Sequence, residues 1–150
     1  MEFSETSQII FQLFLATLLG GLIGLERETK KKEAGLQTYS LVALGACLFT
    51  ITSLLLAKSG VIDDPSPIIL AIAIGMGFIG AGAIFRGENQ IKGLTTAAGL
   101  WVTAAIGLAV GARFYLLAVC AAFLALIIFV GFGLLEEKIF VRKKENGDKE

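Results

Sequence analysis

Uncharged apolar runs divide the chain into five segments of nearly equal length. They cover residues 7–25, 38–57, 65–85, 93–112 and 114–135. Each run contains about 19–22 residues, and as an α-helix it would be roughly 28–33 Å long, the thickness of the hydrocarbon core of a bilayer. The pattern predicts an all-α, polytopic membrane protein with five transmembrane helices.

Only Arg113 separates the last two runs. A single helix through both would exceed about 60 Å, which is twice the bilayer core, so we expect a turn at residues 111–113. Because this turn is tight, a four-span protein or a re-entrant segment is the alternative.

Lys and Arg are distributed unevenly between the two expected sides of the membrane. The loops after the first and third runs, together with the tail, hold eleven of the thirteen, whereas the loops after the second and fourth runs hold two. The positive-inside rule then predicts an N-terminus outside and residues 136–150 as a charged cytoplasmic tail. Four spans would place that tail outside. No Lys or Arg precedes the first run, so we expect a retained span and not a signal peptide.

Composition narrows the function classes. Hydrophobic residues make up 55% of the chain and charged residues 17%, and the net charge is zero. This balance is unlike a disordered chain or a nucleic-acid-binding protein. The sequence has no histidine, and its two cysteines, Cys47 and Cys120, lie far apart. We therefore expect no catalytic residue, no cofactor and no histidine- or CxxC-type metal site.

Glycine is frequent in the expected helices, with eighteen in the chain. Small residues at intervals of four allow helix backbones to approach closely in a membrane. We expect intramolecular helix packing at these positions; a homodimer seam and a pathway lined by mobile backbone are the alternatives. The expected packing positions are Gly20, Gly24, Gly77, Gly80, Gly82, Gly99, Gly107 and Gly111.

Three aromatic residues are candidates for the belt at the membrane–water interface, where amphipathic rings gather. They are Trp101, Phe114 and Tyr115. Phe114 and Tyr115 directly follow the expected turn.

Polar residues gather where the first and third runs end and the second and fourth begin, which is one face under the predicted topology. This cytoplasmic-face cluster comprises Glu26, Arg27, Gln37, Thr38, Arg86, Glu88, Asn89, Thr95 and Thr96. We expect Thr95 or Thr96 to cap the fourth helix, whose first turn is a candidate anion site. Glu26–Arg86 or Arg27–Glu88 pairs would reduce the cost of charges beside the hydrocarbon. The cluster either anchors helix ends or forms a binding or regulatory site.

No run contains Asp, Glu, Lys or Arg in its interior. Ion pathways usually place carboxylates at such positions, and Mg²⁺ prefers oxygen ligands. Carboxylates near the membrane occur here only at the ends of the runs: Glu26, Glu28 and Glu88 on one side, Asp63 and Asp64 on the other. A monomeric magnesium pump or channel is therefore poorly supported.

Four ordered stretches resemble the membrane domain of the MgtC/SapB family. They are residues 20–27 (GGLIGLER), 35–38 with 41–46 (GLQT and LVALGA), 75–84 (GMGFIGAGAI), and 93–101 with 104–107 (GLTTAAGLW and AAIG). The resemblance covers roughly residues 10–115. The functional positions that it implies are Glu26, Arg27, Thr38, Gly80, Gly82, Arg86, Thr95, Thr96 and Trp101.

This resemblance implies a bacterial inner-membrane protein linked to growth under magnesium limitation and, in pathogens, to survival inside host cells. The family is thought to modulate other membrane proteins and not to transport ions itself. Two departures matter. Gln37 stands where the family usually has Arg, which puts an ionic role there in doubt. Longer members carry a soluble C-terminal domain, so functions of that domain are not expected here.

The leading hypothesis is a non-enzymatic protein that modulates another inner-membrane complex. The opposing hypothesis is an oligomeric transporter of a small ion or solute, related to Mg²⁺. An embedded enzyme comes third, because no nucleophile–base arrangement is visible. The expected partners are the lipid bilayer, further copies of the chain with a dimer favoured, and an unidentified membrane complex.

Overall fold

The computed structural model describes residues 3–87 and 90–133. The chain is mostly helical, and this part contains five α-helices: α1 (Phe3–Thr29), α2 (Leu36–Lys58), α3 (Ser66–Gly82), α4 (Leu94–Gly111) and α5 (Tyr115–Ile127). A short π-helical segment, η1 (Ile128–Phe132), continues α5. The predicted tail at 136–150 lies outside the described residues.

Helices α1, α2 and α4, and α5 together with η1, are long and apolar enough to cross a membrane, whereas α3 is a shorter apolar helix of 17 residues. The predicted separation of the last two runs is confirmed, since α4 ends at Gly111 and α5 begins at Tyr115. Arg113, between them, adopts a left-handed backbone conformation (φ 67°), which reverses the chain direction within three residues.

The third helix ends earlier than predicted, and an all-α fold is not quite correct. The sequence predicts one span over residues 65–85, but α3 stops at Gly82 and a two-stranded antiparallel hairpin follows. Strand β1 (Phe85–Arg86) pairs with β2 (Ile91–Lys92). Glycines at 80 and 82 weaken the last turn of α3, and the aromatic and β-branched residues that follow favour strands.

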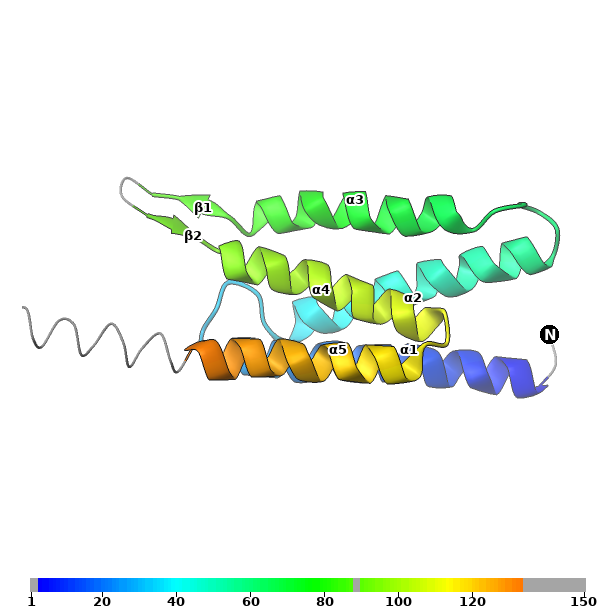
Figure 1. Ribbon diagram of the computed structural model, residues 1–150, viewed down its shortest axis with the longest axis horizontal. Coiled ribbons are helices and arrows are strands. Elements are labelled where there is room, and N and C mark those ends of the chain that lie inside the picture. Colours follow the sequence, from blue (N-terminus) through cyan, green and yellow to red (C-terminus); the bar gives the residue numbers. More distant parts are fainter. Residues whose placement is uncertain (1–2, 88–89, 134–150) are drawn as a thin grey trace, which may run out of the picture.

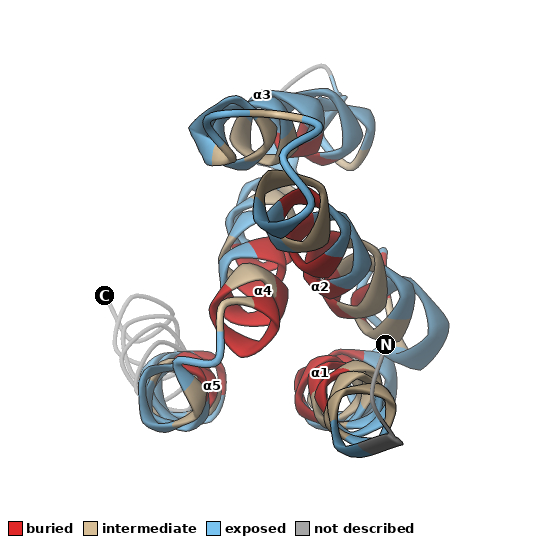
Figure 2. Ribbon diagram, turned by 90° about the vertical axis from the view of Figure 1, so that its right-hand side faces the viewer, coloured by how far each residue is buried: buried red, intermediate tan, exposed pale blue. Residues whose placement is uncertain are grey.

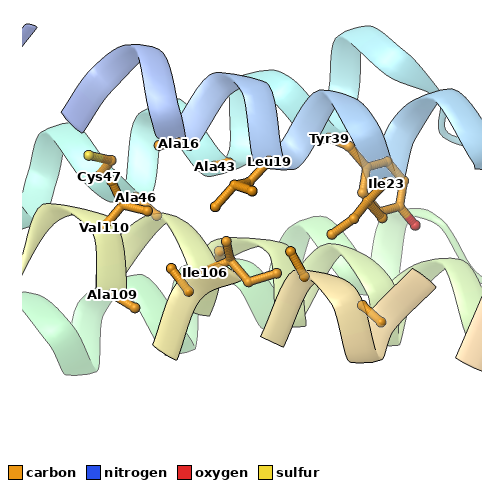
Figure 3. Close-up of a cluster of buried hydrophobic side chains, with 14 of the residues drawn as sticks. Ala16, Leu19, Ile23, Tyr39, Ala43, Ala46, Cys47, Ile106, Ala109 and Val110 are labelled. Atoms are coloured by element: carbon orange, nitrogen blue, oxygen red, sulfur yellow. The ribbon is translucent and has the colours of Figure 1, made fainter. Parts of the chain in front are cut away.

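Helix α4 is central in the bundle. It contacts each of the other four α-helices, and the end-on view in Figure 2 places α3 outermost, on the side away from α1 and α5. The core between α1, α2 and α4 is built from large apolar side chains such as Ile23, Ile106 and Val110, each at most 1% exposed. Figure 3 shows these side chains meeting between the helices.

Most of the predicted packing glycines lie where two helices touch. A Cβ atom at Gly20 or Gly24 would meet the backbone of α2 at under 3 Å, and one at Gly111 would be 2.8 Å from the Cys47 carbonyl oxygen. Gly107 lies directly on the Ala43 backbone. These positions exclude any side chain because the neighbouring atoms are backbone, which cannot rotate away.

The other predicted glycines behave differently. Gly99 packs on Phe129 and the Tyr39 hydroxyl, and a Cβ at Gly80 would make ordinary contact with Ala97. Gly77 and Gly82 have open space where a side chain would go. The expectation of intramolecular packing is therefore wrong for these two, because α3 touches its neighbours along one narrow face and they point away from it.

Three buried polar side chains within the bundle, Gln12, Thr50 and Thr103, donate to backbone carbonyls. Gln12 is 1% exposed, and its side-chain amide donates to the carbonyl oxygens of Val110 and Gly111, each at 2.8 Å. These carbonyls end α4 and have no partner within their own helix. Thr50 and Thr103 each donate to the carbonyl four residues earlier.

Candidate functional site

Polar residues gather at one end of the bundle, where α1 ends and α4 begins. In Figure 1 this is the left-hand end, where the loop between α1 and α2, the hairpin and the end of α5 also lie. A pocket of about 820 Å³ opens there, and we call it the α1–α4 pocket. Its lining comprises Arg27, Lys30, Lys32, Glu33, Ile91, Gly93, Leu94, Thr95, Thr96, Ile128, Phe129, Phe132 and Gly133.

Arg27 forms the buried base of this pocket. Its side chain is 4% exposed, and its Nε lies 3.0 Å from Oε2 of Glu26. The guanidinium carbon is 4.1 Å from the centre of the Phe129 ring, a cation–π contact. Lys30 Nζ lies 3.1 Å from the other Glu26 oxygen and donates to the Phe129 carbonyl. The Glu26–Arg86 pair predicted from sequence is therefore not formed, because Glu26 pairs with Arg27 and Lys30.

Thr96 does not cap α4, contrary to the prediction. Its hydroxyl donates to Oε2 of Glu33 at 2.6 Å, and this hydrogen bond is the main reason why the pKa of Glu33 lies below its ordinary value of 4.5. The Thr96 carbonyl oxygen accepts from the Tyr39 hydroxyl at 3.4 Å. These two bonds join α4 to the α1–α2 loop and to α2.

The first amides of α4 have no side-chain acceptor among the described residues. The residue before the helix, Gly93, has a left-handed backbone (φ 86°). A Cβ at Gly93 would collide with the Ala83 carbonyl, so only glycine fits. Thr95, the other predicted cap, lines the pocket. The first amides of an α-helix lack intrahelical acceptors and carry positive dipole charge, which suits an anion.

Three other described members of the predicted cluster, Gln37, Thr38 and Arg86, do not line the α1–α4 pocket. Gln37 and Thr38 are exposed on the first turn of α2, and Thr38 lines a second, largely apolar groove between α2 and α3. Arg86 is exposed on β1. Glu88 and Asn89 fall outside the described residues, so the predicted Arg27–Glu88 pair is not described.

The predicted interfacial aromatics also differ in position. Phe114 is exposed in the α4–α5 turn. Tyr115 packs its ring edge-on against Phe11, with centroids 5.7 Å apart. Trp101 is half exposed but is the eighth residue of α4, about 10 Å along the helix. It therefore lies well inside the span, and not at its end.

Sequence reasoning missed the residues that complete the pocket. From sequence, Lys30, Lys32 and Glu33 are only loop charges, and Phe129 is only part of the last span. The available signal was the basic run at residues 30–32, which begins three residues after Arg27. Within residues 3–87 and 90–133 no group of three or more His, Cys, Asp or Glu side chains could hold a metal ion.

The sequence is similar to known proteins over most of its length. The chain matches the MgtC family over residues 13–138. It is 41% identical over 132 residues to the Escherichia coli K12 protein named "Putative magnesium transporter YhiD", covering 82% of this chain and 60% of the relative. It is 45% identical over 113 residues to Protein SapB of Bacillus subtilis, covering 71% of this chain and 49% of the relative.

A third relative is Protein MgtC of Salmonella typhimurium LT2, which is 44% identical over 102 residues, covering 68% of this chain and 42% of the relative. The chain thus spans about half the length of these three relatives. No solved structure matches it. The match begins at residue 13 within α1 and covers the α1–α4 pocket and α4, and the chain belongs to the MgtC family.

Proposed function

We propose that the chain crosses a bacterial inner membrane five times, with its N-terminus outside and its C-terminus in the cytoplasm. With 17 residues, α3 is at the lower end of the length that spans a bilayer. Lys30, Lys32 and Lys92 belong to the end of the bundle that holds the α1–α4 pocket, whereas Lys58 and Arg113 belong to the opposite end. This arrangement supports a cytoplasmic location for the pocket.

We further propose that the protein is a non-enzymatic modulator of another membrane complex and acts during magnesium limitation. The observation that carries this proposal is the closed interior of the bundle. Its helices meet backbone to backbone at Gly107 and Gly111, and the side-chain N–H groups of Gln12 donate to the last carbonyls of α4. Such an interior offers a single chain little polar surface along which an ion could move, whereas the pocket end offers charges to a partner.

The test measures Mg²⁺ flux and growth on the same protein. Proteoliposomes holding a Mg²⁺-sensitive dye report uptake, and a strain lacking its own copy reports growth at low Mg²⁺. We expect the wild type to restore growth without producing flux. Uptake that increases with protein and disappears in Glu26→Gln, but persists in the matched carboxylate control Asp63→Asn at the other end, would refute the modulator.

The second candidate is an oligomeric transporter related to Mg²⁺. It is favoured by the name of the relative YhiD and by the outward-facing glycines of α3, which would let another copy approach. The flux experiment separates the two candidates, because only the transporter moves Mg²⁺ in the absence of other proteins.

A homodimer through the outer face of α3 is part of this proposal. A Cβ atom at Gly77 or Gly82 would have nothing within 4 Å, and Phe78, which lies between these two positions around the helix, is 85% exposed. Close helix approach at these glycines would bury that surface. Gly77→Leu should reduce crosslinked dimer in membranes, whereas Ala105→Leu, at an exposed small residue on α4, should not. Equal dimer yields in both variants would contradict this seam.

A further inference from the structure

The α1–α4 pocket holds a buried cation whose hydrogen-bonding capacity is not used. Arg27 carries five N–H donors, and its side chain makes no hydrogen bond to any residue that the structure describes; its buried Nε faces Oε2 of Glu26 at 3.0 Å as an ion pair. The contacts it has are ionic with Glu26 and aromatic with Phe129. A buried charge with unpaired donors is costly. Arg27 lines the pocket, so an anion there would give its Nη groups the acceptors that they lack.

A second, independent feature faces the same space. Leu94, Thr95 and Thr96 start α4 and line the pocket, and no side chain caps their amides. The glycine before them brings the chain into the helix with a left-handed backbone, leaving the amides uncovered. The aligned peptide dipoles of α4 add roughly half a positive charge at this end.

The charge balance indicates the charge of the ligand. Arg27, Lys30 and Lys32 contribute three positive charges. The carboxylates are Glu26, which is paired with Arg27 and Lys30, and Glu33, which accepts from Thr96. The net charge is therefore one positive charge plus the helix dipole. It matches the single negative charge of a phosphodiester better than a dianion.

The remaining wall is apolar and reaches the outside of the bundle. Leu94, Ile128 and Phe132 line the pocket and are 49–61% exposed, so they continue into the surface that faces lipid tails. Basic pockets between transmembrane helices commonly hold anionic headgroups. We propose that the α1–α4 pocket binds the phosphodiester of an anionic phospholipid, with the phosphate on Arg27 and the first turn of α4. This proposal holds whether the protein modulates a partner or transports an ion.

Native mass spectrometry of the purified full chain tests it. The protein is released from nanodiscs containing equal amounts of phosphatidylglycerol and phosphatidylcholine, and retained lipid is counted. We expect one phosphatidylglycerol per chain, retained in clear preference to phosphatidylcholine. Lys32→Gln should weaken retention about fivefold, the contribution of one cation beside an anionic headgroup. Arg27→Gln should weaken it more than the single exposed lysine does.

The matched control is Arg86→Gln, which removes an exposed cation at the same end but outside the pocket. It should leave retention close to that of the wild type. Should Arg27→Gln fail to fold, Lys32→Gln alone decides, because Lys32 is exposed and has no ion pair with a described residue. Equal retention of both lipids, or an equal effect of Arg86→Gln and Lys32→Gln, would overturn the site. Inorganic phosphate that displaces the lipid with the same Lys32 dependence would overturn the lipid assignment.

Discussion

The contact between α2 and α4 at Gly107 allows a quantitative test of the packing argument. In Gly107→Ala the new methyl would lie within 3 Å of both the carbonyl carbon and the Cα of Ala43. Because these atoms are backbone, the two helices must separate. Overpacking costs about 1–3 kcal/mol, and removing a helical glycine returns up to about 1 kcal/mol. We therefore expect a net loss of about 2 kcal/mol, towards the upper end of this range because backbone cannot move aside.

The matched control is Gly45→Ala on α2, where nothing lies within 4 Å of the added methyl. It keeps the gain in helix propensity without the collision, so its effect should be between zero and about 1 kcal/mol of stabilisation. SDS titration in dodecylmaltoside micelles, followed by fluorescence of Trp101, the single tryptophan, measures both. The expected gap of about 2–3 kcal/mol is more than tenfold in the unfolding equilibrium. Equal unfolding midpoints in both variants would refute the reasoning.

Three further predictions concern other parts of the chain. Thr96→Val should raise the pKa of Glu33 towards 4.5, because the hydroxyl that stabilises its carboxylate is lost. Carbon NMR of labelled carboxyl groups measures this change in pKa. Asp64, whose pKa is lowered by Ser66, is the unaffected control. Since the pKa of folded Glu33 lies below its unfolded value, the wild-type Thr96–Glu33 contact should stabilise the fold at neutral pH and be lost as the pH falls below about 4.5. Gln12→Ala should lower the free energy of unfolding by about 2 kcal/mol, because two carbonyls of α4 lose their buried donor. Gln8→Ala, one turn earlier, should lower it clearly less in the same SDS titration. An equal loss in both variants would argue against the carbonyl contacts. Reporter fusions after Lys32 and Gln90 should report the cytoplasm and fusions after Asp64 the outside, whereas a Gln90 fusion that reports outside would contradict five spans.

The helices could be predicted from the sequence to within a few residues, but the hairpin after α3 could not. Length and absence of charge are local properties, so the runs marked the helices and Arg113 marked the last turn. The α3–α4 connection was predicted less well, because Phe85 is apolar and ends the uncharged run 65–85, although it belongs to a paired strand. Hydropathy does not distinguish an apolar strand from the end of an apolar helix.

The candidate site was predicted in part. The location of Arg27, Thr95 and Thr96 at one end followed from counting alternate helices. The partners of Arg27 could not be found by this count. Glu26 is its neighbour in sequence, and Phe129 comes from the last span. The cap of α4 was also predicted incorrectly: Thr96 turns to Glu33, and a hydroxyl in the first turn of a helix can serve either partner.

The sequence by itself determined the apolar helices, the uneven distribution of Lys and Arg, and the small residues that permit close packing, because these depend on residue type and spacing along one segment. Only the tertiary structure decided which small residues are used. Gly107 lies on the Ala43 backbone while Gly77 faces open space, and both have similar apolar surroundings in sequence. The difference arises from how each helix is rotated about its axis and which neighbours it meets. The rotation of α1 likewise decides that Arg27 lines the pocket beside the first turn of α4.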